Sequence, residues 1–502
     1  MGGGLMQLVA YGAQDMYLTG NPQITFFKIV YRRHTNFSME AIEQTFNGTA
    51  DFGRTVSATI ARNGDLIHRM YVQATIPSVT VPNDERFRWM NWLGHLLLET
   101  VELEIGGQKI DKHYGDWLHI WNELTQTAGH QAGYANMVGN VPKLTQYTAN
   151  GNTSSVELYI PLQFWFNRNP GLALPLIALQ YHEVKINIKF RQATDCYHCT
   201  DAALATPVLS ASLWVDYVYL DTEERRRFAQ VSHEYLIEQL QFTGDESTSA
   251  TSTKVKMAFN HPVKELIWVA QRSSHINSDL NYGGFQWFNY TDRSDPTYFS
   301  GTPSDPLGGG MGTAAFHSGN FPYSLPFSGS VNAINNNTLN VPSPITANTH
   351  NPGVVTFDDL LNNNGAGIQD GTAGQAWRAN LSVLDTGENP VSKAKIQLNG
   401  HDRFAERNGR YFNLVQPYQH HENIPATGIN VYSFALKPED HQPSGTCNFS
   451  RIDTATLHLT LTGNAILQND NNTAENVRVR VYAVNYNVLR IMSGMGGLAY
   501  SN

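Results

Sequence analysis

The sequence predicts an all-β protein whose short antiparallel strands form a sandwich or a barrel. Three features point to this class: apolar and polar residues alternate with a period of two, turn residues separate the alternating runs, and charged residues are scarce. Alternation over five or more residues indicates a strand with one buried face. The clearest runs are VELEI at 101–105, LWVDYVY at 213–219, LHLTL at 457–461 and VRVRV at 477–481.

Shorter runs and turn signals extend this pattern along the chain. The shorter runs lie at 72–76, 185–190, 255–259 and 396–398. Residue pairs that favour tight turns stand at Asn63-Gly64, Gly106-Gly107 and Asn399-Gly400. Many short strands with such turns between them are typical of antiparallel sandwiches and barrels.

The composition fits a protein of two or three domains with a large core. The chain has 502 residues and a mass of 55.9 kDa. Charged residues make up 15% of it, against roughly 25% in a typical soluble protein, while glycine and aromatic residues are abundant. Lysine and glutamate are the side chains that keep the exposed faces of helices in contact with water, and this chain has few of them. Aromatic residues favour strands. A hydrophobic share of 41% excludes general disorder.

Charge and hydropathy disfavour several classes of partner. The net charge is −9 and the pI is near 6.0, so we expect no direct binding of nucleic acid; the three arginines at 225–227 are too few for a basic face. The most apolar stretches, 92–98 and 172–179, are too short for a transmembrane helix. The first residues do not resemble a secretory signal, and Met6 replaces the Ser or Thr of a myristoylation signal. Three cysteines cannot form a disulfide framework, which indicates a reducing compartment.

A few short helices are expected between the strands. Residues 86–100 carry apolar residues at helical spacing, and 116–124 form a second candidate. The third, 221–230, begins at Asp221, which can cap the first turn, with Glu224 three residues on. We interpret it as a solvated surface helix, and its position near mid-chain makes it a natural connector between two domains.

The two halves of the chain echo each other. LEIGG at 103–107 is similar to IQLNG at 396–400, and each is followed by charged residues and then aromatic ones. Later in each half the same order of elements occurs, at 164–185 and at 432–461. It consists of a strand that ends near a proline, a Pro/Gly loop and another strand. Two echoes in the same order predict a duplicated β-domain.

One segment differs in composition from the rest. From residue 266 to 387 there is no Lys or Glu, while Asn, Gly, Ser, Thr and Pro abound and aromatic residues are threaded through. Low-complexity sequence would lack these rings. We therefore predict an ordered, loop-rich surface insertion in the second domain, packed by its own aromatic side chains.

The motifs of common enzymes and metal sites are missing from the sequence. No phosphate-binding loop, HExxH or GxSxG occurs. Cys196 and Cys199 form a lone CxxC around His198, and the third cysteine, Cys447, is far along the chain, so two reduced thiols are favoured over zinc. QHHE at 419–422 could supply ligands but is better interpreted as a polar loop. We predict no catalytic, cofactor-binding or metal-binding residue.

Paired carboxylates for glycoside hydrolysis are left open, because sandwich enzymes bring distant residues together. Glu102 and Glu104 share one strand face, and His182-Glu183 and His233-Glu234 are similar pairs; a solvated face is the simpler interpretation of each. Glycosylation sequons include those at Asn47, Asn152, Asn289, Asn336, Asn380, Asn448 and Asn471. A chain rich in Asn, Ser and Thr produces them by chance, so no glycosylation site is assigned.

Long segments resemble the major capsid proteins of large icosahedral DNA viruses, those of algal viruses above all. The segments lie at 7–37, 101–117, 169–186, 221–244, 395–419, 441–457 and 485–500. They include QLVAYGAQDMYLTGNPQITFFKIVYRRHTNF, NPGLALPLIALQYHEVKI and NYNVLRIMSGMGGLAY. The resemblance runs from one end of the chain to the other but fails between about 271 and 391.

The resemblance implies two consecutive eight-stranded antiparallel jelly rolls with a few short helices. The expected parts are an N-terminal arm at 1–24, the first jelly roll at 25–220, a helical linker at 221–240 and the second jelly roll at 241–502. The insertion, about 266–390, would form the outward tower of a trimer. The expected function is structural and not enzymatic: three chains form a pseudo-hexagonal capsomer of an icosahedral shell.

The resemblance also implies partners and a location. Expected partners are further copies of the chain, neighbouring capsomers, and minor capsid and penton proteins. The arm is expected on the inner side of the particle, and the capsid protein close to an inner viral membrane. The location is the virion, assembled in the host cytoplasm. Relatives carry glycans on outer loops, but those sites cannot be transferred to this chain. The alternative is a jelly-roll protein that binds carbohydrate or hydrolyses glycosides.

Overall fold

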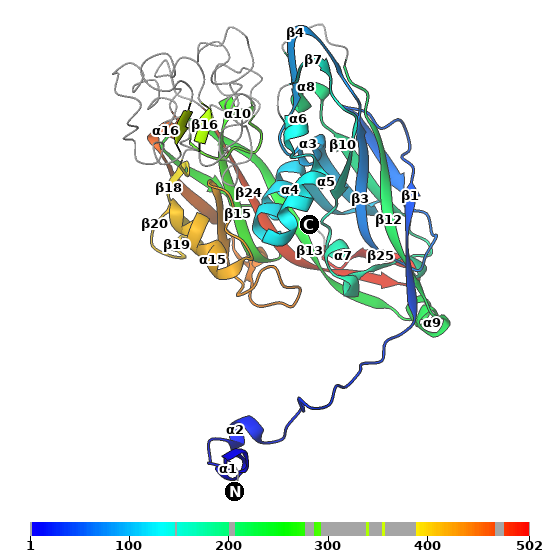
Figure 1. Ribbon diagram of the computed structural model, residues 1–502. Helices are drawn as coiled ribbons and strands as arrows, with labels where there is room; N and C mark the ends of the chain where they lie inside the picture. The colour runs from blue at the N-terminus through cyan, green and yellow to red at the C-terminus, as the bar shows by residue number, and fades with distance from the viewer. Residues whose placement is uncertain are drawn as a thin grey trace.

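The computed structural model describes most of the chain. The described ranges are 3–145, 148–199, 206–276, 286–292, 388–466 and 476–500, with two short paired strands, β16 (Thr338–Asn340) and β17 (Val354–Thr356). The greater part of the predicted insertion lies outside these ranges, as does the predicted outward tower. Two β-sandwiches stand side by side, and the N-terminal segment extends away from them (Figure 1).

The first sandwich has the strand order of a jelly roll. Its β12 sheet runs β1 (Phe37–Gln44), β12 (Ser210–Leu220), β3 (Leu66–Ile76), β8 (Val156–Pro161), with β9 (Leu174–Pro175) beside β3. Its β10 sheet runs β2 (Thr55–Thr59), β10 (Val184–Phe190), β5 (Leu98–Ile105), β6 (Gln108–Tyr114). Counted along the chain without the small additions, these sheets have the orders 1-8-3-6 and 2-7-4-5. A third small sheet joins β11 (Tyr197–Cys199), β4 (Thr80–Trp89) and β7 (Thr148–Asn152).

The second sandwich repeats this order. Its β24 sheet runs β13 (His233–Thr248), β24 (Val477–Met492), β15 (Pro262–Arg272), β21 (Ile429–Ser433), with β22 (Cys447–Asn448) and β25 (Met495–Leu498) at its margins. Its β23 sheet runs β14 (Ser252–Lys256), β23 (Ala455–Leu461), β18 (Val391–Leu398), β19 (His401–Asp402), with β20 (Arg407–Asn408) beside β18. The orders are again 1-8-3-6 and 2-7-4-5, which confirms two consecutive antiparallel jelly rolls.

The sequence echo falls on equivalent hairpins of the two jelly rolls. Gly106 and Gly107 turn the chain between β5 and β6, with φ of 58° and 82°. Asn399 and Gly400 turn it between β18 and β19, with φ of 48° and 82°. Left-handed backbone of this kind selects glycine or asparagine, which explains why a five-residue pattern survives in both halves.

In the described ranges, two short helices precede β1 and the others lie in the connections between strands. They are α1 (Gly3–Val9), α2 (Met16–Thr19), α3 (Leu93–Leu97), α4 (Gly115–Thr125), α5 (Ala128–Val138), α6 (Pro142–Thr145), α7 (Trp165–Arg168), α8 (Ala193–Cys196), α9 (Thr222–Gln230), α10 (Ser273–Ile276), α15 (Gln416–His420) and α16 (Gly463–Ile466). The helices expected at 116–124 and 221–230 are confirmed as α4 and α9. The helical linker expected at 221–240 is shorter, because β13 begins at His233, and the side chain of Asp221 makes no capping hydrogen bond.

The helix expected at 86–100 is wrong. Residues up to Trp89 belong to β4, only the five residues of α3 are helical, and β5 starts at Leu98. Trp92 has a φ of 52°, a left-handed conformation that interrupts any continuous helix. Leu93, Leu96 and their neighbours are fully buried, so the apolar spacing reflects burial on all sides and not one face of a long helix.

The exposed N-terminal segment is longer than the expected arm of 1–24. The first strand begins at Phe37, and the side chains from Gly20 to Asn36 are exposed, with Phe27 at 98%. Figure 1 shows this segment running from β1 to the small helices α1 and α2, away from the sandwiches. No helix in the described ranges is both long and apolar enough to cross a membrane.

The start of the predicted insertion is also corrected. Residues 266–272 are not loop but the end of β15, a central strand whose residues from Val263 to Arg272 are all buried. A continuous apolar run, LIWVA, is typical of a strand covered on both faces. The aromatic residues at 286–290 also do not pack only within the insertion: Trp287 lies under Arg191 of the first jelly roll, at 4.5 Å.

Replacing Gly106 by alanine is expected to lower the melting temperature more than replacing Gly107. Both positions have positive φ, where a side chain costs about 1 kcal/mol. A Cβ at Gly106 would also collide with the ring of His182, whereas one at Gly107 would meet no atom within 4 Å. Calorimetry of the two variants measures the difference, and equal melting temperatures would contradict this account.

Candidate functional site

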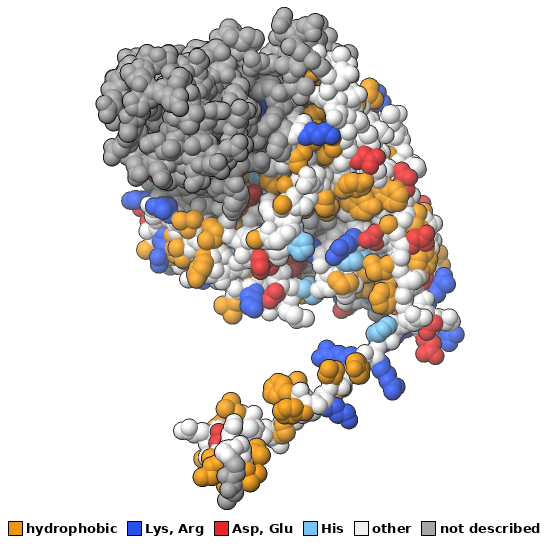
Figure 2. Space-filling model, viewed as in Figure 1, with side chains coloured by type: hydrophobic (Ala, Val, Ile, Leu, Met, Phe, Trp, Pro, Cys, Tyr) orange, Lys and Arg blue, Asp and Glu red, His pale blue; other side chains and the backbone are white. Residues whose placement is uncertain are grey.

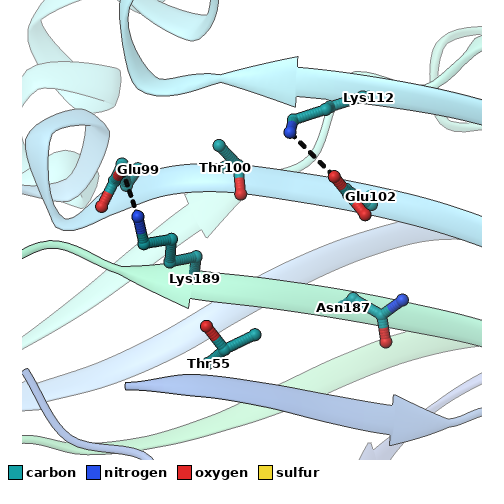
Figure 3. Close-up of a pocket in the computed structure, with 7 residues that line it drawn as sticks. All are labelled: Thr55, Glu99, Thr100, Glu102, Lys112, Asn187 and Lys189. Atoms are coloured by element: carbon teal, nitrogen blue, oxygen red, sulfur yellow. Dashed lines mark hydrogen bonds and ion pairs between the residues drawn. The ribbon is translucent and has the colours of Figure 1, made fainter. Parts of the chain in front are cut away.

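A shallow pocket of about 310 Å³ lies on the outer face of the β10 sheet (Figure 3). It is lined by Thr55, Glu99, Thr100, Glu102, Lys112, Asn187 and Lys189. Each carboxylate is neutralised: Glu99 lies 2.6 Å from Lys189, and Glu102 lies 2.8 Å from Lys112. Burial would raise the pKa of Glu102, but hydrogen bonds from Lys112 and Lys109 outweigh it and lower the pKa. The general acid of a glycosidase needs the opposite shift.

The other candidate pairs have structural contacts. Glu104 accepts a hydrogen bond from Asn187 at 3.1 Å. The Nδ1 atom of His182 is hydrogen-bonded to the backbone of Gly496, and Glu183 pairs with Lys185 at 3.4 Å. In the same way, His233 contacts the carbonyl oxygen of Phe228 at 2.8 Å, and Glu234 pairs with Arg490 at 2.8 Å. The structure brings none of these pairs together into one site.

The CxxC spans the end of α8, at Cys196, and the whole of β11, which ends at Cys199. Cys196 is fully buried, and burial raises the pKa of its thiol, which disfavours a reactive thiolate. Burial also lowers the pKa of His198 to about 4. Cys447 belongs to the second jelly roll, on β22. Within the described parts of the chain, no group of three His, Cys, Asp or Glu side chains could hold a metal ion.

The segment at 419–422 is not simply a polar loop. The side chain of His421 is fully buried between two carboxylates, 2.9 Å from Glu265 and 2.8 Å from Glu439. Burial would lower the pKa of His421, but the two ion pairs outweigh it and raise the pKa to about 9. His421 is therefore a cation held inside the second jelly roll, and it ties the end of α15 to β15.

The described sequons differ in accessibility. Asn47, Asn152 and Asn448 are exposed, whereas Asn289 is half-buried and donates to Gln286 at 2.6 Å. The remaining three, Asn336, Asn380 and Asn471, lie outside the described residues.

The two jelly rolls meet at a junction, where α4 packs on the outer face of the β24 sheet. Helix α4 belongs to the connection between β6 and β8, which we call the first excursion (residues 115–155). Its buried residues Trp117, Ile120, Trp121 and Leu124 form one cluster with Ile267, Val269, Tyr290, Ile429, Val431, Tyr482 and Val484 of the second jelly roll. Each fully buried apolar side chain contributes about 2 kcal/mol. The β24 sheet is therefore buried on both faces, by its own core and by α4.

Charged side chains cross the same junction. Arg168 at the end of α7 lies 2.9 Å from Glu238 on β13, and Glu238 lies 2.8 Å from Lys264. Burial would raise the pKa of Glu238, but Arg168 and Lys264 outweigh it and lower the pKa. Arg480 on β24 pairs with Asp116 of α4. Removing one partner of such a buried pair is costly, so the contacts hold the two jelly rolls in one orientation.

Both jelly rolls match families of virus capsid proteins. Residues 25–221 match the family described as major capsid protein N-terminus. Residues 224–497, more than half of the chain, match the family described as large eukaryotic DNA virus major capsid protein. The chain belongs to this family. The two matches meet at α9, which links the two jelly rolls.

Individual relatives agree over the whole length. The major capsid protein of Phaeocystis pouchetii virus is 51% identical, and that of Paramecium bursaria Chlorella virus 1 is 42% identical, each over 100% of both chains. Among solved structures, the quasi-atomic model of the PBCV-1 virus capsid is similar with a TM-score of 0.64 at 36% identity, covering 95% of this chain and 100% of that one. The Faustovirus major capsid protein shares the fold, with a TM-score of 0.64 at 12% identity.

The chain is thus a structural protein of a large DNA virus, and it is located in the virion capsid. The alternative of a carbohydrate-binding or glycoside-hydrolysing protein is not supported. Sequence reasoning missed the junction. Its signals are visible afterwards: two tryptophans four residues apart on α4, and an apolar run in β15 with no polar face.

The ion pairs of His421 predict a loss of stability at alkaline pH. A folded-state pKa of about 9, above the ordinary 6.5, means that the stabilisation is fully present below pH 6.5 and is lost as the pH rises through 9. The melting temperature of the native chain should therefore fall more between these pH values than that of the matched double variant Glu265→Gln/His421→Gln. Parallel pH profiles for the two proteins would exclude a charged His421.

Proposed function

We propose that three copies of the chain form one capsomer with a pseudo-hexagonal outline, and that these capsomers build the shell. The observation that carries the proposal is the repeated strand order of the two jelly rolls. A chain that provides two equivalent units gives six around a threefold axis, which is the shape that tiles a surface hexagonally. The similarity to the PBCV-1 virus capsid supports the same arrangement.

The proposal includes a division of the chain and a set of partners. It comprises an N-terminal arm, two jelly rolls joined near α9, and an outer insertion after β15. The partners are neighbouring capsomers and minor capsid and penton proteins, with assembly in the host cytoplasm. The N-terminal segment is suited to such contacts because it is exposed and rich in apolar side chains, among them Phe26, Phe27, Ile29, Val30 and Tyr31. No catalytic, cofactor or metal residue is assigned.

The mass of the purified chain in solution tests the central part of this proposal. Light scattering after size exclusion should give about three times 55.9 kDa. A stable monomer that cleaves members of a glycan panel would contradict both the trimer and the structural role. Incubating the trimer with the same panel provides the control, and no cleavage is expected.

A further inference from the structure

The contact between the two jelly rolls of one chain provides a template for the contact between chains. We propose that the second jelly roll docks its own excursion between β19 and β21 (residues 403–428, the second excursion) on the outer face of the β12 sheet of a second copy. This inference rests on the proposed trimer and names the surfaces that form it. The two jelly rolls have the same strand order, so the two contacts would be equivalent.

Within the chain, the template is a connection between the fifth and sixth strands packed on a 1-8-3-6 sheet. The first excursion leaves β6 and enters β8, and its helix α4 covers the outer face of the β24 sheet. The second excursion occupies the same place in the second jelly roll, between β19 and β21. The β12 sheet is the counterpart of the β24 sheet in the first jelly roll. The chain therefore carries an excursion of this kind on its second jelly roll and a 1-8-3-6 sheet of this kind in its first jelly roll.

The second excursion is anchored at its base and presents apolar side chains at its surface. It contains β20, a π-helical turn at Tyr411–Val415, and α15. Phe412 is fully buried and lies 5.1 Å from Trp268, ring centre to ring centre, while the ring of Tyr411 stacks under Arg407. Tyr418 in α15, in contrast, is 77% exposed. A rigid base with an exposed aromatic tip is the geometry of an interface anchor.

The outer face of the β12 sheet carries aromatic side chains that stay half-exposed. Tyr71 on β3 stacks on Trp214 of β12, with ring centres 6.3 Å apart and planes 2° apart. Tyr159 on β8 packs edge-on against Tyr71 at 6.0 Å. All three alternate with buried neighbours, which places them on the face away from the core. Over β3 and β12, Figure 2 shows hydrophobic and acidic side chains together.

The charges of the two surfaces are complementary. The face of the β12 sheet bears Glu43, Asp216 and Glu157 against one cation, Arg69. The second excursion has three exposed arginines, at 403, 407 and 410, and two exposed carboxylates, at 406 and 422. Opposite charge on the two surfaces favours this pairing over the pairing of either surface with itself.

The positions of the two surfaces allow a closed ring. In Figure 1, α15 and β20 lie at one side of the molecule, and β1 and β12 lie at the other. Contact between these sides is head-to-tail, so each added copy leaves one surface of each kind free until the ring closes. In the proposed trimer, the ring closes when three copies, or six jelly rolls, have joined.

The substitution Tyr418→Glu tests the second excursion, with Tyr181→Glu as the matched control. The two tyrosines are 77% and 76% exposed, so neither change should disturb the fold. We expect Y418E to remain folded by circular dichroism. Its trimer should dissociate at protein concentrations about tenfold or more higher than those at which the native trimer dissociates. Y181E should behave as the native chain does.

A second variant, Glu43→Arg, tests the receiving face, and a mixture tests the head-to-tail geometry. E43R should weaken the trimer as well. In a mixture of Y418E and E43R, the only intact pairing joins the second excursion of E43R to the β12 sheet of Y418E. The mixture should therefore form heterodimers and no trimers. If the native chain is trimeric and Y418E is equally trimeric, the proposed function stands and this inference is overturned. A trimeric Y418E that fails only in particle assembly would assign the surface to another capsid partner, and would equally overturn it.

Discussion

The outer face of the β24 sheet must be covered, and the rest of the structure depends on this constraint. Ile267, Val269 and Val484 point away from the core of the second jelly roll, yet they are buried because α4 of the first jelly roll lies over them. Exposed together, they would form an apolar patch of the kind that drives aggregation. The two jelly rolls are consequently one folding unit with a fixed mutual orientation, as a building block for a regular shell requires.

The long strands β13 and β24 strengthen this coupling. Each has 16 residues, and Ile237, Leu489 and Ile491 at one end belong to the hydrophobic core of the first jelly roll, not of the second. Ion pairs also fix the orientation, since the partly exposed Arg168 and the buried Glu238 come from different jelly rolls. Apolar contact thus supplies the stability of the junction, and the charged pairs restrict it to one geometry.

Much of the fold could be predicted from the sequence, because alternation and turn residues are local signals. The runs at 101–105, 213–219, 457–461 and 477–481 all lie within strands, and the glycine hairpins mark equivalent places in the two halves. The failures concern residues buried on several sides. The predictions for 86–100 and 266–272 are wrong because continuous burial removes the period that separates helix, strand and loop. The polar-loop interpretation of His421 is wrong because its two carboxylate partners, Glu265 and Glu439, lie on other segments of the chain.

The central claim is that each 1-8-3-6 sheet is covered by the excursion of a neighbouring jelly roll, first within the chain and then between chains. Hydroxyl-radical labelling of side chains measures this coverage residue by residue. On assembly from dilute monomer to trimer, labelling of Tyr418, Trp214 and Tyr71 should fall, while labelling of Tyr181 should stay constant. Unchanged labelling of Tyr418 and Trp214 in a trimeric sample would contradict the account.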